Sequence, residues 1–325
     1  MIEASLPLLQ RWIGHVSVLG LVGVAAWVAW VRRATLSRLR AGLSSEETGS
    51  AIAALTGRVE RIGLGAALGL VLAWALAFVV QVSAFRDPFV PLREDVAFLL
   101  WNTSWGSAWL VQGSVGVVLL LVFLRLVRSR QTARRTTGET TGDSGRLSAG
   151  WRSVAALVLL LPLTQALSGH AMGETGLMRV VAVGADAMHG LAAGIWIGSL
   201  AVILLTHWPA PVNRPLLTAQ FRAFSPLAVL GVALLVGAGG VLSVIHLQAL
   251  PDLWHTVYGR TLLAKVTVAG GALALGYRNW RKGLPRIEET AGEAERVRVR
   301  AAIEVAAALA VLGLTAFLTA LPTPE

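Results

Sequence analysis

Methionine and histidine residues gather in one short part of this chain. Three of its four methionines and two of its six histidines lie between His170 and His189, in the order His170-Ala-Met172, then Met178, then Met188-His189. Thioether and imidazole groups together suit a soft cation such as Cu(I). The alternative is that the methionines fill gaps in a helix bundle and the histidines are hydrogen-bonded packing residues.

A second signal is a carboxylate inside an apolar stretch. Asp186 and His189 are three residues apart, so on a helix they occupy neighbouring positions of one face. If this helix begins near Leu177, they lie roughly 14 and 18 Å along it, close to the middle of a membrane. A carboxylate at that depth is costly unless it is paired or hydrated, which indicates a functional site. The alternative is a structural salt bridge from Asp186 to Lys265 or Arg260.

Five of the six histidines are predicted in the outer half of the protein, where a metal would be captured. The predicted metal ligands are His189, Met188, His170, Met172, His15, His246 and His255, supported by Asp186 and Lys265. Asp186 would orient His189 or hold its proton. His207 is expected at the cytoplasmic interface, as an anchor beside Trp208.

The elements that must position these residues are membrane helices. The chain is 55% hydrophobic and only 14% charged, which is typical of a membrane protein. Eight apolar stretches approach the about 20 residues that span a bilayer, the fourth being the shortest. They are residues 6–30, 62–85, 105–126, 154–168, 177–206, 224–247, 261–280 and 301–321. The predicted fold is an all-α polytopic membrane bundle of about eight transmembrane helices. Glycines 190, 194 and 198 continue a small-residue stripe from Asp186 that would let another helix pack closely.

The basic residues predict the orientation of these helices. Most of the 28 Lys and Arg residues fall in alternate loops, within residues 32–61, 125–152, 214–222 and 278–300. The positive-inside rule then predicts a multi-pass protein of a bacterial cytoplasmic (inner) membrane with both termini extracytoplasmic. The basic loops are expected to contact the lipid bilayer, and no nucleic-acid partner is expected. The chain has no cysteine and no Walker motif, so we expect no thiolate metal site, no ATP hydrolysis and no enzyme activity. Transport would run down a gradient or on a coupled ion.

A polar segment divides the chain. Residues 128–150 are rich in Arg, Thr and Gly and are predicted as a flexible cytoplasmic linker between the third and fourth helices. Residues 1–127 would hold helices 1–3 of the first four-helix half, and residues 151–325 would hold helix 4 and a core of helices 5–8. Residues 100–112 and 253–265 share Leu, Trp, Thr and Gly positions, which favours two parallel four-helix repeats.

These motifs resemble the copper resistance protein D family (CopD/PcoD, with its YcnJ-like membrane domain). Residues 186–198 are similar to the fifth-helix signature of the family, and residues 221–228 fit its sixth helix. Residues 256–265 and 276–279, around the seventh helix, carry the most specific match. The resemblance is strongest between residues 168 and 279. It implies an eight-helix inner-membrane protein that moves copper into the cytoplasm beside a periplasmic copper-binding partner. Neither end carries a copper-binding sandwich domain, so that partner is expected to be a separate extracytoplasmic copper-binding protein.

The main hypothesis is a copper permease. His170 and Met172, assisted by His246 or His255, would receive Cu(I), and His189, Met188 and His15 would hold it at mid-membrane. The first alternative is a haem-binding b-type membrane electron-transfer protein, with His15 and His189 as axial ligands. The second is a non-transporting copper-delivery factor that uses the same ligands.

Overall fold

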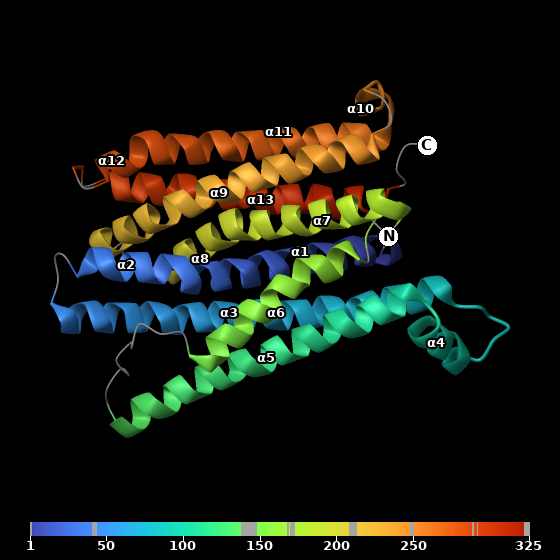
Figure 1. The fold of residues 1–325 in the computed structure, drawn as a ribbon, viewed down its shortest axis with the longest axis horizontal. Helices are drawn as coiled ribbons and strands as arrows, with labels where there is room; N and C mark the ends of the chain where they lie inside the picture. Colours follow the sequence, from blue (N-terminus) through green and yellow to red (C-terminus); the bar gives the residue numbers. More distant parts are fainter. Residues whose placement is uncertain are drawn as a thin grey trace.

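The computed structural model describes residues 2–40, 44–137, 148–167, 169, 173–207, 213–247, 250–287, 289–290 and 292–321, and the regular structure in these ranges is all helical. Long apolar runs favour this outcome, because a helix satisfies its own backbone polar groups where no water can reach them. The long helices lie side by side along one direction (Figure 1). Seven of them are long and apolar enough to cross a membrane. The prediction of an all-α polytopic bundle is confirmed.

The first part of the chain makes three long passes. α1 (Ile2–Ala26) continues through a π-helical turn, η1 (Trp27–Val31), into α2 (Arg32–Leu39). α3 (Ser45–Phe85) runs back, and α5 (Ser104–Thr137) follows the short helix α4 (Leu92–Trp101). A capping box begins α3: the Ser44 side chain accepts from the Glu47 backbone N–H, and the Glu47 side chain accepts from the Ser44 backbone.

The second part of the chain makes five passes. α6 (Ala149–Ala166) is followed by α7 (Gly176–Ala193), which continues through η3 (Gly194–Gly198) into α8 (Ser199–Thr206). The remaining elements are α9 (Arg214–His246), α10 (Asp252–His255), α11 (Val257–Arg278), η4 (Asn279–Gly283), α12 (Leu284–Arg286) and α13 (Glu293–Leu318).

α11 is the predicted helix that is absent from the seven candidate spans. It carries Arg260 and Lys265 and several glycines, which lower its hydropathy. It nevertheless runs the length of the bundle and packs along α13 (Figure 1). With α11 included, the described helices make eight passes, so α1 begins and α13 ends at the same end of the bundle. We call this the terminal end.

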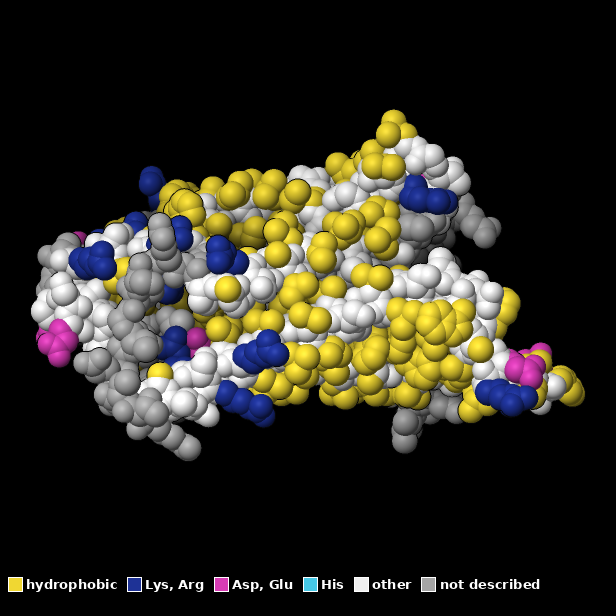
Figure 2. All heavy atoms as spheres, turned by 60° about the horizontal axis from the view of Figure 1, so that its bottom comes forward, with side chains coloured by type: hydrophobic (Ala, Val, Ile, Leu, Met, Phe, Trp, Pro, Cys, Tyr) yellow, Lys and Arg dark blue, Asp and Glu magenta, His cyan; other side chains and the backbone are white. Residues whose placement is uncertain are grey.

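α1 lies at the centre of the bundle, and α9 lies at its surface. Of the most apolar 18 residues between Ser5 and Leu39, 56% are buried, whereas of the most apolar 18 residues in α9 only 6% are buried. Figure 2 shows the consequence on one face: hydrophobic side chains form a broad band, and most of the visible Lys and Arg side chains gather at the end opposite the terminal end. This distribution agrees with the charge asymmetry of the sequence.

The predicted linker, 128–150, is wrong at both of its ends. α5 continues to Thr137, and α6 begins at Ala149, so only residues 138–148 separate the two helices, and 138–147 of these lie outside the described ranges. The physical reason is Arg130, which packs back against α3. Its Nε and Nη2 donate to the Glu60 carboxylate at 2.7 and 2.9 Å, and its Nη1 donates to the Ala53 carbonyl at 3.2 Å.

Candidate metal centre

The glycine stripe of α7 and η3 fixes the position of the predicted site. A Cβ atom at Gly198 would overlap the Leu19 carbonyl of α1, and one at Gly194 would press on Val22. Towards the terminal end the stripe turns to α6, where a Cβ at Gly190 would lie 3.6 Å from Pro162. The stripe therefore packs α7 against α1 and α6, as its spacing predicts.

Asp186 continues this stripe towards the terminal end. Its Oδ2 atom lies 3.7 Å from where a Cβ at Gly169 would stand, directly after α6. The carboxylate thus faces a neighbouring part of the protein, and its side chain is only partly exposed. It also interacts electrostatically with Lys265 of α11. Asp186 therefore has a partner charge, which the sequence alone offered as one of two possibilities.

His189 is held by α9. Its Nδ1 atom lies 3.1 Å from the Leu235 carbonyl oxygen. Because a carbonyl only accepts, Nδ1 carries the proton, and Nε2 keeps a lone pair. A Cβ at Gly239 would lie 3.1 Å from Cε1 and 3.2 Å from Nδ1 of this ring, so the glycine makes room for it. This is how proteins orient an imidazole for metal binding through the other nitrogen.

Three helices contribute to one polar cluster around Lys265. His15 of α1, His189 of α7 and Asp186 of α7 each interact electrostatically with the Lys265 ammonium group. His15 and His189 are each 13 residues beyond the first residue of their helix, about 20 Å at 1.5 Å per residue. Both helices begin at the terminal end (Figure 1). The two imidazoles therefore lie at a similar depth.

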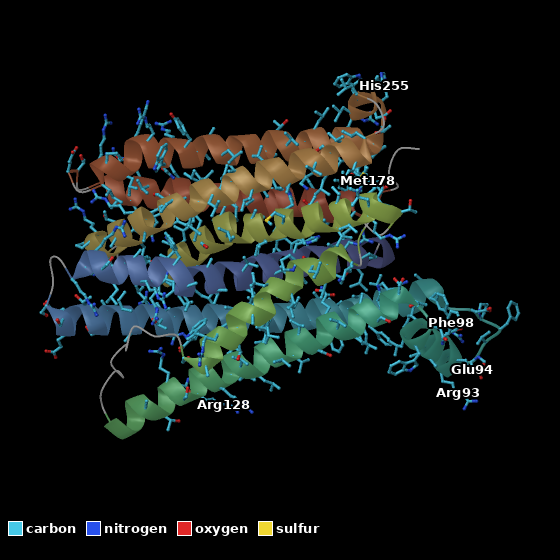
Figure 3. All side chains as sticks on the ribbon, viewed as in Figure 1. Arg93, Glu94, Phe98, Arg128, Met178 and His255 are labelled. Carbon is cyan, nitrogen blue, oxygen red and sulfur yellow. The ribbon has the colours of Figure 1, made fainter. Side chains whose placement is uncertain are left out.

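Other predicted ligands lie elsewhere. Met188 is next to His189 in sequence, but adjacent helix positions do not face each other, and the Met188 side chain is 40% exposed. His246 ends α9, where its Nδ1 atom donates to the Leu242 carbonyl of its own helix at 2.8 Å. His255 is exposed on α10, at the far corner of the terminal end (Figure 3).

The predicted entry site, His170 and Met172, lies outside the described residues. Within the described residues, no group of three or more His, Asp or Glu side chains is arranged to hold a metal ion. The cluster around Lys265 consequently offers one or two imidazole nitrogens. Such a small ligand set suits transient binding of a metal ion better than its storage.

His207 lies directly after the last residue of α8, and its predicted role as an interfacial anchor is wrong. Its residue surface is only 4% exposed. The Gln220 amide nitrogen donates to His207 Nε2 at 3.3 Å, and the Gln220 carbonyl oxygen accepts from Trp27 Nε1 at 3.2 Å. Burial, followed by the nearby Arg58 and Arg298 guanidinium groups, lowers the pKa of His207 to about 4. Trp208, its predicted companion, lies outside the described residues.

Glu304 of α13 is a buried carboxylate that the sequence motifs did not single out. Only 3% of its surface is exposed, and its Oε1 atom accepts a hydrogen bond of 3.0 Å from Trp196 Nε1 in η3. The signal was available, because Glu304 lies inside the predicted apolar stretch 301–321. The rule that singled out Asp186 applies equally to Glu304.

Two comparisons with known proteins identify relatives. Residues 218–318 match the family model described as Copper resistance protein D. Over 281 residues the chain is 28% identical to the Copper transport protein CutJ of Bacillus subtilis (strain 168). The match covers 83% of this chain and 47% of the relative. The chain thus spans about half the length of that relative. No solved structure matches the chain. The resemblance that the sequence motifs predicted is confirmed.

Proposed function

Because residues 218–318 match the Copper resistance protein D family model, we propose that this chain belongs to that family and moves copper ions across a cytoplasmic membrane, towards the cytoplasm. The similarity to a relative named as a copper transport protein supports copper as the substrate. The multi-pass bundle supports transport, since the helices are long and apolar enough to cross a membrane. The proposed orientation puts the terminal end outside the cytoplasm, because Lys and Arg gather at the opposite end.

The observation that carries this proposal is the cluster around Lys265. His189 presents Nε2 as a free lone pair, since the Leu235 carbonyl holds its Nδ1 proton. His15 lies at similar depth and shares Lys265 as an electrostatic neighbour. We propose that these two imidazoles hold copper as Cu(I), which accepts low coordination by nitrogen and sulfur. Asp186 and Lys265 balance each other's charge, so the site itself is close to neutral before the ion arrives.

The route to this cluster begins at the terminal end. His170 and Met172 are proposed as the first ligands, with His246 at the end of α9 assisting. Met188 would then contribute only if its thioether turned from the exposed face of α7. A separate extracytoplasmic copper-binding protein would deliver the ion to these residues.

A loading experiment tests the central site. The purified protein is loaded anaerobically with Cu(I), and metal content and absorption spectrum are recorded for the parent protein and the His189→Ala and His255→Ala variants. We expect copper retention in the parent protein and in His255→Ala, whose side chain is exposed on α10, and loss in His189→Ala. Equal retention in His189→Ala would refute the central site. A Soret band with stoichiometric iron would instead establish the haem protein.

A flux experiment separates a permease from a delivery factor. The protein is reconstituted in vesicles, and copper entering the lumen is measured with an internal chelating dye. Copper accumulation that His189→Ala abolishes supports transport. Copper binding without accumulation would identify a non-transporting delivery factor that uses the same ligands.

A further inference from the structure

Glu304 is a buried acid with no counter-ion among the residues that the structure describes. The residue is 3% exposed, and its hydrogen-bond donor is the indole of Trp196, at 3.0 Å. On the α11 side, Gly276 leaves the space that the carboxylate fills, since a Cβ there would lie 3.0 Å from Oε1. One neutral N–H donor compensates a negative charge poorly in an apolar interior.

Charged groups occur on several of the elements that pack against α13. The elements packed against α13 carry these ionisable residues: Glu3, Arg11 and His15 on α1, Arg214, Arg222 and His246 on α9, Tyr258, Arg260, Lys265, Tyr277 and Arg278 on α11, and Arg281 and Lys282 on η4, with none on α8. On α13 itself they are Glu293, Glu295, Arg296, Arg298 and Arg300. Among the side chains that the structure describes, none of these residues forms an ion pair with Glu304.

The basic residues of α13 that come closest in sequence have acidic partners of their own. Arg296 and Arg300 both donate to the Glu293 carboxylate at 2.9 Å. Arg298 donates to Glu295 at 2.7 Å. All three pairs lie within the first eight residues of α13, and Glu304, which lies further along the helix, takes part in none of them. Its carboxylate is therefore set apart from the ion pairs that stabilise the start of this helix.

The hydrogen-bond donor of Glu304 stands in an irregular turn. Trp196 is the middle residue of η3, where the i to i+4 pattern of α7 gives way to a π-helical turn. Such π-turns inside longer helices are frequent at functional sites. Trp196 is seven residues beyond His189 on the same continuous helix, about 10 Å further from the terminal end. Glu304 thus lies between the proposed copper site and the basic end of the bundle.

We propose that Glu304 is a proton-binding site that exchanges one proton for each Cu(I) ion that passes. The carboxylate takes up one proton to form an O–H bond, and this bond breaks as the monovalent cation arrives, so the net charge of the apolar interior is unchanged. The carboxylate takes up this proton from the cytoplasmic side, towards which the copper moves, and releases it to the extracytoplasmic side, from which the copper comes. This inference rests on the proposed copper transport for its coupling, although the proton site itself does not depend on it.

The proton site is tested without copper. Infrared difference spectra across a pH titration of the purified protein report the C=O stretch of protonated carboxyl groups. We expect a band that titrates in the parent protein, disappears in Glu304→Gln and shifts in Trp196→Phe, which removes the indole donor. The control is Glu295→Gln on the same helix, with a half-exposed side chain, which should leave the band in place. A band unchanged in Glu304→Gln would overturn the proposal.

The exchange is tested in vesicles under an imposed pH gradient. In the parent protein and in Glu295→Gln, copper accumulation should change with the gradient, and in Glu304→Gln this dependence should be lost. Gradient dependence that persists in Glu304→Gln would refute exchange at this residue. If no variant transports copper, the proposed function fails while the infrared band still reports on the proton site.

Discussion

Replacing Arg130 by alanine should destabilise the bundle strongly, although Arg130 lies in a segment whose composition predicts a linker. The substitution leaves the Glu60 carboxylate, which is 3% exposed at the side chain, without the two donors that now reach it at 2.7 and 2.9 Å. Removing one partner of a buried ion pair costs about 3–5 kcal/mol. Arg130 itself is 23% exposed, so water can compensate in part, and we expect about 2–3 kcal/mol. That loss corresponds to about a 30- to 150-fold change in the unfolding equilibrium.

The assay is unfolding of the purified protein in mixed micelles, followed by far-UV circular dichroism as denaturing detergent is increased. The matched control is Arg128→Ala, two residues away on the same helix but exposed (Figure 3), which should change the free energy of unfolding by less than about 0.5 kcal/mol. The double variant Glu60→Gln with Arg130→Ala should recover part of the loss, because no buried charge remains. If Arg130→Ala is as stable as Arg128→Ala, the ion pair does not hold α5 against α3.

Three further outcomes are expected. Gly239→Val should displace the His189 ring, whose atoms lie 3.1–3.2 Å from the Cβ position, and should abolish Cu(I) retention in the metal analysis. The control Gly240→Val, with nothing within 4 Å of its Cβ, should retain copper. The pKa of His207 is about 4 in the folded protein and about 6.5 in an unfolded chain. Neutral His207 therefore contributes about 3 kcal/mol to the free energy of unfolding, which is fully present above about pH 6.5 and is lost as the pH falls to 4. A free energy of unfolding that does not change with pH across this range, in denaturation curves, would contradict this prediction. Gly198→Ala should cost roughly 1–3 kcal/mol or more through overlap with the Leu19 carbonyl, and Gly184→Ala, which meets nothing within 4 Å, should be tolerated in the same unfolding assay.

Hydropathy and charge were sufficient to predict the passes of the chain. Each of the eight predicted stretches corresponds to a helical pass, because a membrane leaves an apolar segment of this length few alternatives. The boundaries were less predictable. α3 begins at Ser45, well before the predicted residue 62, since helices continue beyond the membrane where capping and side-chain contacts stabilise them. The short helices α4 and α10 were missed as well, because both lie between the apolar stretches and are too short to cross a membrane.

Polar contacts between helices were predictable only in part. The stripe of Gly190, Gly194 and Gly198 packs as its spacing indicates, because spacing on one helix determines which residues share a face. The partners of Arg130 and His207 depend on how distant segments meet, and no spacing within one helix specifies that. Glu304 was visible as an acid in an apolar stretch, but its indole donor comes from a helix that is far away in sequence.

The copper and proton sites proposed for this chain should be separable in the same protein. His189 and Trp196 are seven residues apart on one continuous helix, about 10 Å along its axis, and the groups around them differ: imidazoles near Lys265 on one side, a carboxyl and an indole on the other. Ten ångströms is close enough for charges to influence each other in an apolar interior, yet too far for shared ligands. Glu304→Gln should therefore retain Cu(I) at parent stoichiometry, and His189→Ala should retain the titrating carboxyl band. Loss of copper from Glu304→Gln would mean that the carboxylate is part of the metal site, and the exchange of one cation for another at separate positions would be refuted.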